Sequence, residues 1–381
     1  MYDCLITGAG VVGLSLAYEL AQSGIEVRII DRGEPGREAS WAGAGILPAG
    51  NTATATNSFE QLGGLSSQLH LKWSKQLREE TKIDNGYRRC GGIHVARKAA
   101  DRVALLDCLQ YYTTHNIRHE SLTSAELVEH VPCLAGPTSR NEIQEACYVP
   151  DNAQLRNPRH LKALLAACQA KGVEVSSQVE LLGFETSGQR ITAALTSTGP
   201  IYADQYCVTS GAWTKPLVEP LGWSPSLKPI RGQMVLFQAP DQLFLPVINE
   251  ASRYLVPRDD GRILAGSTEE DVGFHKETTV EAIANLVSFA CSLVDRLKTV
   301  PVERAWAGLR PSTPDRLPYL GRVADWDNLS VAAGHFRDGL WLSTGTAKVM
   351  SQLIQGKTPC CDLSDFALDR DVDPTIYQNN T

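Results

Sequence analysis

The sequence Gly8-Ala9-Gly10-Val11-Val12-Gly13 directly follows an apolar stretch at residues 2–7. Residues 14–22 have helical periodicity, residues 26–30 are predicted to form a second strand, and Asp31 ends it. A glycine motif between strand and helix, with an acidic residue about 20 positions later, is typical of a βαβ unit that binds a dinucleotide. Gly8 permits the tight turn, Gly10 lets a pyrophosphate approach the backbone, and Gly13 lets the helix lie close to the sheet.

The helix after these glycines can serve as a phosphate site, because its N-terminus offers free N–H groups and a positive dipole end. Asp31 can accept hydrogen bonds from a ribose hydroxyl group. The complete context favours an adenine dinucleotide, and a structural glycine-rich turn is the alternative. The sequence contains one such motif. A single motif favours electrons that come from an organic substrate rather than from a second, nicotinamide dinucleotide.

Composition limits the class of protein. The 381 residues are 43% hydrophobic and 21% charged, which is typical of a globular chain with two or three domains. The net charge of −7 argues against a nucleic-acid partner, and no apolar run approaches the ~18 residues that span a bilayer. The ten cysteines lack zinc-type spacing, and the N-terminus does not resemble a signal peptide. We therefore expect a cytoplasmic protein with free thiols, no metal and no membrane partner.

A second group of polar residues flanks Asp260-Gly261, a pair that predicts a two-residue hairpin turn with Asp259 opposite Arg262. In that register Tyr254 lies opposite Ser267, and Ser252 lies opposite Glu269. Because side chains alternate along a strand, these four share one face. Polar side chains that point inward are costly unless a polar ligand meets them. The alternative is a face exposed to solvent.

The C-terminal third contains two arginines at distinctive positions. Arg310 lies between an apolar strand and Pro311, where its guanidinium can hold a carboxylate through two parallel hydrogen bonds; an internal ion pair is the alternative. Residues 334–341 lead into the last helix, whose N-terminus can face an anion. On local sequence alone, Arg337 is typical of a surface residue and His335 of a packed histidine. The polar residues after 357 are expected to fray.

Together these motifs resemble the D-amino acid oxidase superfamily of FAD-dependent oxidoreductases and, within it, the glycine oxidases. The first segment below is shared by many flavoproteins, whereas the last four in this order are more specific. The segments are residues 8–13, 40–47, 229–233, 254–257, 308–311 and 334–339. They extend over nearly the whole chain in the family's order.

The resemblance implies an α/β fold: an FAD-binding Rossmann-like domain of the glutathione-reductase type, with an inserted α+β substrate domain on a large antiparallel sheet. The implied FAD domain comprises residues 1–86, 147–225 and 305–365, the substrate domain residues 87–146 and 226–304, and a polar tail residues 366–381. The cysteine that anchors flavin in monomeric sarcosine oxidases has no counterpart, which implies non-covalent FAD. Tetramers are common in the family, which implies a homo-oligomer.

The resemblance also assigns roles to residues. Arg310 would clamp the substrate carboxylate, Tyr254 would be a second donor, and Arg337 would contact both flavin and carboxylate. Glu269 is the fourth implied substrate-binding residue. It lies where glycine oxidases can carry an apolar side chain in the pocket wall, and a glutamate there could favour a cationic amine or could turn away. Ser252 lies where an imidazole is possible. The implied cofactor-binding residues are Gly8, Gly10, Val11, Val12, Gly13, Asp31, Arg32, Ala39, Ser40, Ala44, Gly45, Ile46, Val179, Gly211, His335, Phe336, Arg337, Asp338, Gly339, Leu340 and Trp341.

The implied reaction is oxidative deamination of glycine, sarcosine and small D-amino acids such as D-alanine. A hydride would pass from the α-carbon to flavin N5, and O2 would be reduced to H2O2. The imine would hydrolyse to a 2-oxo acid or supply thiazole synthesis for thiamine. Such chemistry needs positioning more than a base, so Arg310, Tyr254 and Arg337 are the implied catalytic residues. The alternatives are a D-amino acid dehydrogenase that reduces a quinone, an RNA-modifying oxidase and a non-catalytic flavin-binding module.

Overall fold

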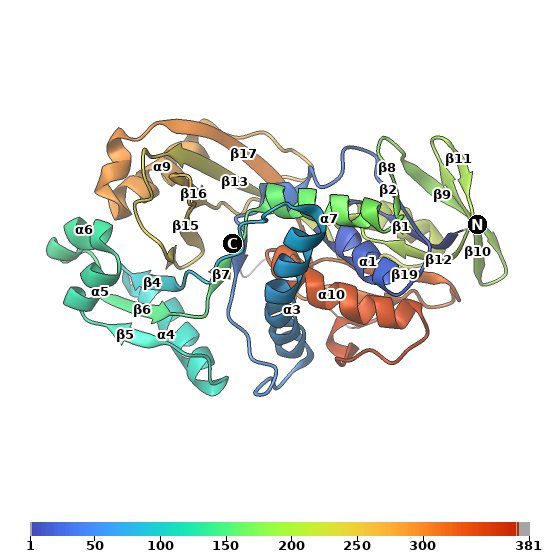
Figure 1. The fold of residues 1–381 in the computed structure, drawn as a ribbon, viewed down its shortest axis with the longest axis horizontal. Helices are drawn as coiled ribbons and strands as arrows, with labels where there is room; N and C mark the ends of the chain where they lie inside the picture. The colour runs from blue at the N-terminus through green and yellow to red at the C-terminus, as the bar shows by residue number, and fades with distance from the viewer. Residues whose placement is uncertain (1, 371, 373–381) are drawn as a thin grey trace.

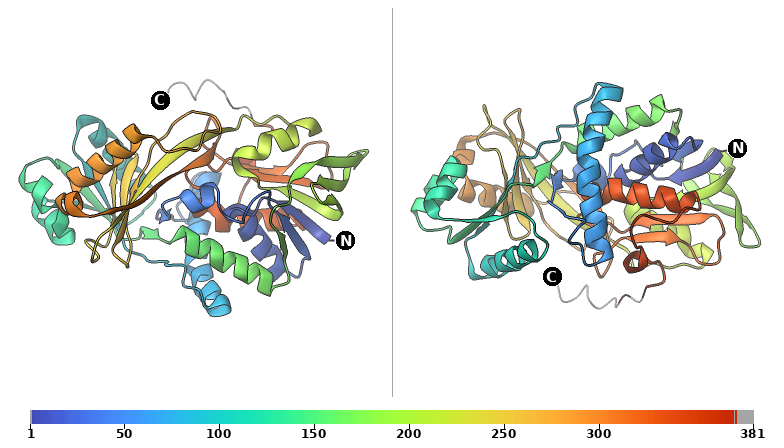
Figure 2. Two further views of the ribbon diagram at one scale, coloured as in Figure 1. Left: turned by 90° about the horizontal axis from the view of Figure 1, so that it is seen from above. Right: turned by 60° about the horizontal axis from the view of Figure 1, so that its bottom comes forward.

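Two large sheets lie side by side along the length of the molecule (Figures 1 and 2). The structure is a computed structural model that describes residues 2–370 and residue 372. The first sheet has the order β18-β19-β12-β1-β2-β8, and only β18 is antiparallel to its neighbour. Its strands are β1 (Tyr2–Thr7), β2 (Val27–Ile30), β8 (Glu174–Ser176), β12 (Ala203–Val208), β18 (Tyr319–Arg322) and β19 (Leu329–Ala333).

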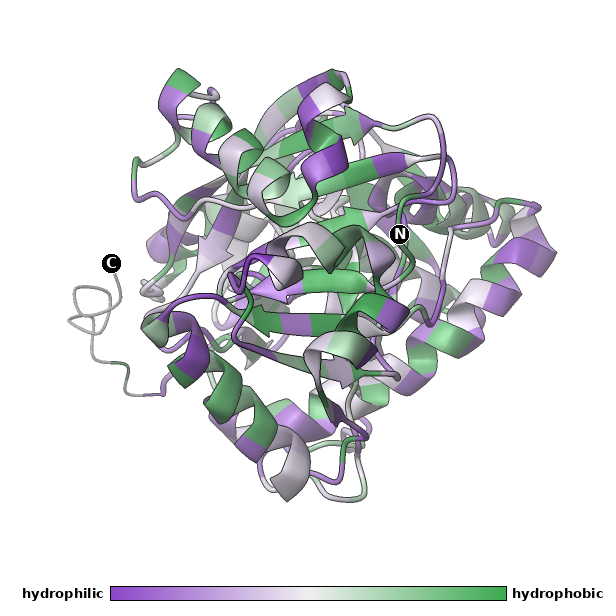
Figure 3. Cartoon of the chain, turned by 90° about the vertical axis from the view of Figure 1, so that its left-hand side faces the viewer, coloured by the Kyte–Doolittle hydropathy of each residue, from purple (hydrophilic) through white to green (hydrophobic). Residues whose placement is uncertain are grey.

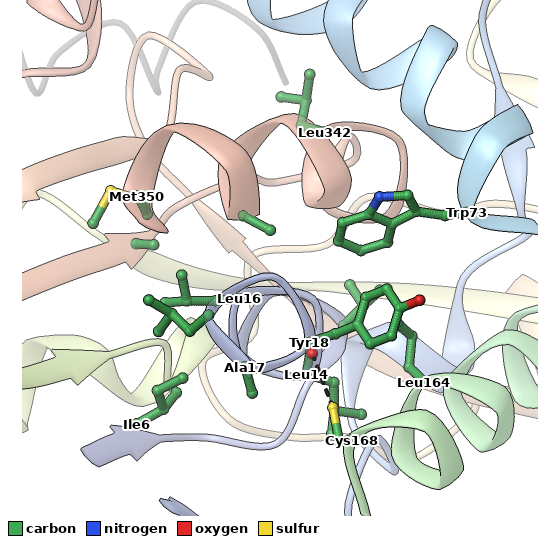
Figure 4. Packing of buried hydrophobic residues seen from close by; sticks show 14 of the residues in the cluster. Ile6, Leu14, Leu16, Ala17, Tyr18, Trp73, Leu164, Cys168, Leu342 and Met350 are labelled. Carbon is green, nitrogen blue, oxygen red and sulfur yellow. Dashed lines mark hydrogen bonds between the residues drawn. The ribbon is translucent and has the colours of Figure 1, made fainter. Parts of the chain in front are cut away.

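Helices and a small sheet cover the two faces of this parallel sheet. The helices α1 (Val11–Gln22), α3 (Ser58–Thr81), α7 (Asn157–Ala170) and α10 (Gly339–Ile354) pack together. Figure 4 shows Leu14 and Tyr18 of α1 between side chains of α10 and α7, and these residues belong to one buried hydrophobic cluster. The opposite face contacts β9 (Leu181–Ser187), β10 (Arg190–Thr196) and β11 (Gly199–Ile201).

The predicted βαβ unit is present, with α1 beginning at Val11 directly after the glycine turn. A Cβ on Gly13 would lie 2.0 Å from the backbone oxygen of Gly8 and 2.6 Å from Oγ1 of Thr209. Any larger residue would therefore push α1 off the sheet, because neither contact leaves room for a carbon atom.

The second sheet is mainly antiparallel, with the order β17-β13-β16-β15-β14-β4-β6-β5. Its strands are β4 (Gly92–Ala96), β5 (Glu120–Leu122), β6 (Glu145–Val149), β13 (Lys228–Gln238), β14 (Val247–Glu250), β15 (Arg253–Pro257), β16 (Arg262–Gly266) and β17 (Val302–Ser312). Strand β17 pairs with β13 from Val302 to Ser312, across the domain boundary expected at residue 304. This pairing places Arg310 in the same sheet as Tyr254.

Shorter elements complete the chain. Helices α4 (Ala99–Thr114), α5 (Ser124–His130), α6 (Ala135–Ser139) and α9 (Val280–Leu293) lie beside the second sheet (Figure 1). The chain segments that run between the two sheets contain α2 (Ala39–Ala42), β3 (Ile46–Leu47), β7 (Ala153–Gln154) and α8 (Thr214–Val218). Hydrophobic residues concentrate in the strands, and the surface helices alternate between hydrophobic and hydrophilic residues (Figure 3). In the described part of the chain, no helix is both long and apolar enough to span a bilayer.

The predicted two-residue turn between β15 and β16 is wrong. Tyr254 pairs with Gly266, and the Arg258 N–H donates to the Arg262 oxygen at 2.7 Å. The loop therefore holds three residues and ends at Gly261, whose φ of +79° suits a glycine. In the observed register Tyr254 lies opposite Gly266 and not opposite Ser267, so the predicted shared face of the hairpin is also wrong.

The segment expected to fray is packed where the structure describes it. Phe366 is fully buried in the main core. Nε of Arg370 lies 2.8 Å from Oδ2 of Asp315, and its guanidinium stacks over Tyr319 with 4.0 Å to the ring centroid. The prediction of fraying is therefore wrong up to Arg370. The remainder of the expected polar tail, residues 371 and 373–381, lies outside the described residues.

Candidate active site

A cavity of about 680 Å³ lies between the two sheets. Thr7, Ile30, Thr209 and Ala333 line it at the carboxyl ends of β1, β2, β12 and β19, the usual place for a ligand in an open α/β sheet. The volume is within the range of pockets that hold small molecules and cofactors. The opposite wall comes from β13, β15 and β17.

The glycine turn forms one end of the cavity. Gly8 and Gly10 line it, and the Val11 N–H donates to Oγ of Ser40 at 2.9 Å. The Asp31 carboxylate accepts hydrogen bonds from the Ala9 N–H at 2.7 Å and the Gly33 N–H at 2.8 Å. Asp31 therefore fixes the turn at the N-terminus of α1 and also lines the cavity.

Most of the predicted cofactor residues meet in this cavity. Beyond those already named, Val12, Arg32, Ala39, Ser40, Ala44, Gly45, Ile46, Val179, Gly211 and residues 335–340 line it. Gly13 and Trp341 do not. Trp341 faces α3, because its Nε1 donates to Oγ of Ser67 at 2.9 Å and its ring packs edge-on against Phe59.

Arg310 belongs to β17 and lines the cavity. Its guanidinium lies against the backbone of the neighbouring strand β13 at Gly232. A Cβ on Gly232 would lie 2.2 Å from both Nη atoms of Arg310. Nη2 donates to Oγ of Ser267 at 2.7 Å and Nη1 to the Thr268 oxygen at 2.9 Å. Within the described residues no carboxylate lies within 4.0 Å of this guanidinium, so the structure does not contain the internal ion pair that was the alternative.

The charge on Arg310 is therefore held without a neutralising partner. Desolvation, together with repulsion from Arg337, lowers the pKa of Arg310, while Tyr254 and Glu269 raise it. Tyr254 is buried in the same wall, and within the described part of the chain its hydroxyl group donates to the thioether of Met234 alone, at 3.4 Å. A thioether is a weak acceptor. The two side chains thus offer a cation and a poorly satisfied donor that a carboxylate ligand would complete.

Arg337 is paired rather than free. Nη1 lies 2.6 Å from Oε1 of Glu269, and Nη2 donates to the Ser252 oxygen at 2.8 Å. Arg337 lines the cavity, but Glu269 does not. The ion pair joins the loop before α10 to the loop after β16.

The N-terminus of α10 provides the second end of the cavity. Burial raises the pKa of Asp338 there to about 6. Burial lowers the pKa of His335 to about 3, and its Nε2 lies 3.1 Å from Oγ1 of Thr346. His335 is thus a neutral, packed histidine at neutral pH, as its local sequence suggested.

Many residues of the cavity had no assigned role from the sequence, and three of them lie against predicted site residues. Gly232 belongs to one of the quoted motifs, but its role requires knowing that β13 pairs with β17. Met234 lies two residues further along the same strand. Trp213 follows a second glycine turn, which was the available signal, and the Arg32 guanidinium stacks on it at 3.9 Å from the ring centroid.

Comparison with known families decides the class of protein. The model of the DAO family, described as FAD dependent oxidoreductase, matches residues 3–353. This chain belongs to the DAO family. The resemblance predicted from the sequence is therefore confirmed.

Relatives of this DAO family member match it over almost its whole length. A glycine oxidase of Pseudomonas aeruginosa is 33% identical over 95% of this chain and 97% of its own. A bifunctional protein ThiO/ThiG of Trichormus variabilis is 30% identical over 92% of this chain but only 52% of its own. The crystal structure of glycine oxidase from Geobacillus kaustophilus has a TM-score of 0.91 and 30% identity, with 98% of this chain and 99% of that one covered. The predicted fold class is confirmed.

The cavity fits the FAD that the DAO family uses. Two helices of 12 and 16 residues, α1 and α10, begin at its two ends, so each can direct free N–H groups and a positive dipole end inward. The first suits a pyrophosphate, and the second suits the electron-rich edge of a flavin ring. Small residues of α2 and the following loop leave room for a flat ring between them.

Proposed function

We propose that this protein is an FAD-dependent oxidase of glycine, sarcosine and small D-amino acids such as D-alanine, with O2 as electron acceptor. The observation that carries the proposal is the Arg310 guanidinium, which lies on the cavity wall beside Tyr254 without a carboxylate partner among the described residues. The similarity to glycine oxidases over almost the whole chain supports the substrate class.

The residues of the chain act mainly by positioning. Arg310 would hold the substrate carboxylate in a bidentate contact, and the Tyr254 hydroxyl group would exchange its weak sulfur contact for a carboxylate oxygen. FAD held in the cavity would supply the redox chemistry that oxidises the substrate at its α-carbon and reduces O2. Orientation of the α C–H bond is then the largest contribution of the protein, because a displacement of about 1 Å costs about 100-fold in rate.

Non-covalent FAD is part of the proposal. Among the described residues that line the cavity there is no cysteine. Nε2 of His335 is already in hydrogen-bond contact with Oγ1 of Thr346, at 3.1 Å. Hydrogen bonds from the N-termini of α1 and α10 would hold the cofactor from its two ends. Gly8, Gly10, Asp31 and Arg32 would bind the nucleotide half, and Ala44, Gly45 and Ile46 would lie against the flavin.

We also propose the expected domain division, with the FAD domain on the parallel sheet and the substrate domain on the antiparallel one. A homo-oligomer in the cytoplasm is the proposed state of the protein. The similarity to proteins named ThiO/ThiG supports release of the imine to thiazole synthesis for thiamine. This part of the proposal would be supported if a separate thiazole synthase, mixed with this protein and glycine, formed its imine-dependent product.

The experiment that tests the proposed function is an oxygen-electrode screen of small amino acids and N-methyl amino acids. Glycine, sarcosine and D-alanine should each consume O2 and produce an equal amount of H2O2. A yellow protein that is reduced by these substrates but does not consume O2 would be a dehydrogenase instead. A yellow protein that none of them reduces would refute the proposal.

A further inference from the structure

A second cavity, of about 430 Å³, lies against the other side of α2. Helix α2 contributes Trp41 to this cavity and Ala39, Ser40 and Ala42 to the first one, and Gly43 lines both. We call it the basic cavity, because six cationic side chains line it: Arg156, Arg159, Lys162, Arg258, Arg262 and Arg304. The proposed oxidase reaction makes no use of it.

The basic cavity has an excess of positive charge. Among the residues that the structure describes, only two carboxylates line it, which leaves a formal charge of +4. Asp260 is paired with Arg156 at 2.6 Å and with Arg262 at 2.8 Å. Glu303 is paired with Arg262 at 2.6 Å and with Arg304 at 3.1 Å. Both carboxylates are therefore already shared between cations, and neither can neutralise the rest of the cluster.

Three cations remain without a carboxylate within 4.0 Å among the described residues: Arg159, Lys162 and Arg258. Arg258 is only 5% exposed, and its guanidinium donates to neutral oxygens alone, those of Gln154, Leu155 and Ala44. Desolvation, followed by repulsion from Arg156 and Arg88, lowers the pKa of Arg258 to about 9. A buried charge in this state would be stabilised by an anion in the cavity.

The same cavity has an aromatic wall. Trp41 and Trp306 are half-buried, and their rings meet edge to face with centroids 5.3 Å apart. The Trp306 Nε1–H is satisfied by the Ala42 oxygen at 3.0 Å, so the indole is fixed in place. Helix α7 begins at this wall, and no side chain caps its N-terminus; Pro158 has no N–H, so the backbone donors at the start of the helix are those of Asn157 and Arg159. The cations, the two indoles and these free N–H groups therefore converge on one space.

We propose that the basic cavity binds an aromatic phosphomonoester, with its phosphoryl group held by Arg159, Lys162 and the N-terminus of α7 and its ring held by Trp41 and Trp306. A phosphoryl dianion matches the excess charge better than a carboxylate, and arginine binds phosphate oxygens in a bidentate manner. The aromatic ring of such a ligand would pack on the two indoles and would no longer be exposed to water.

Calorimetric titration of the holoenzyme with phenyl phosphate tests this site. Phenyl phosphate should bind about tenfold more tightly than inorganic phosphate, because only the former contacts the indoles. Phenol and benzoate are control ligands that lack a phosphoryl group, and both should bind more weakly than phenyl phosphate. Binding should also change the tryptophan fluorescence.

Variants locate the bound ligand. Arg159→Glu/Lys162→Glu should weaken phenyl phosphate binding by about 100-fold, since two charge-assisted contacts are lost. Lys72→Glu/Lys75→Glu makes the same change in net charge on exposed residues of α3 that do not line the cavity, and it should bind as the unmodified protein does. Binding that survives in the first double variant, or that is lost in Arg310→Met instead, would overturn the proposal. Equal affinities for phenyl phosphate and inorganic phosphate would also overturn it.

Discussion

Gly232 controls the position of Arg310, and Gly232→Ala tests this directly. The added Cβ would lie 2.2 Å from both Nη atoms of Arg310, so the guanidinium must move by about 1 Å or more to reach a normal contact. The guanidinium is the end of a flexible side chain, so the fold should adapt at little cost. Its hydrogen bonds to Ser267 and Thr268 would be strained or lost.

A displacement of this size in the group that holds the substrate should lower kcat/KM for glycine by about 100-fold, or about 2.7 kcal/mol. Oxygen uptake gives kcat/KM, while the flavin spectrum and thermal unfolding should stay close to those of the unmodified protein. Gly183→Ala is the matched control, because it lies in a strand and a Cβ there would meet nothing within 4 Å. A kcat/KM within about twofold of the unmodified protein would refute the role of Gly232.

Three further predictions concern charged groups. Glu269→Gln should free Arg337 from its 2.6 Å ion pair and so raise kcat/KM for D-aspartate, relative to glycine, by about tenfold; an unchanged ratio would count against it. Because burial raises the pKa of Asp338 to about 6, the folded protein holds this proton more tightly than the unfolded chain, and stability decreases as the pH rises from about 4 to about 6. Asp338→Asn should lack this decrease. The unfolding free energy of the variant minus that of the unmodified protein should therefore rise by about 2 kcal/mol over that pH interval. Parallel profiles of unfolding free energy against pH would contradict this. Arg370→Ala should lower the unfolding free energy by about 2 kcal/mol because it leaves Asp315 unpaired, against about 0.5 kcal/mol or less for the exposed Arg190→Ala, and equal losses would argue against the packed C-terminal segment.

The parts of the fold that depend on local sequence could be predicted. The glycine turn, α1 and Asp31 form one continuous βαβ unit, so their residue types alone specify the arrangement. The hairpin register could not be predicted, because an Asp-Gly pair fits both a two-residue loop and a three-residue loop that ends in a left-handed glycine.

Site residues set by tertiary packing were harder to predict. Trp341 lies in the predicted segment, but the phase of α10 turns it toward α3. Gly232 matters only because β17 is hydrogen-bonded beside it, and nothing in the local sequence indicates that neighbour. The partner of Arg337 is also a tertiary feature, since Glu269 lies 68 residues away in the chain.

The central claim is that Arg310 holds the carboxylate of an amino acid against bound flavin. Anaerobic titration with glycine, followed by the visible absorbance of the flavin, tests it most directly. The account predicts complete and saturable bleaching in the unmodified protein and in Arg190→Met, and bleaching that needs about 100-fold more glycine in Arg310→Met. Bleaching of Arg310→Met at the same glycine concentration as the unmodified protein would contradict it.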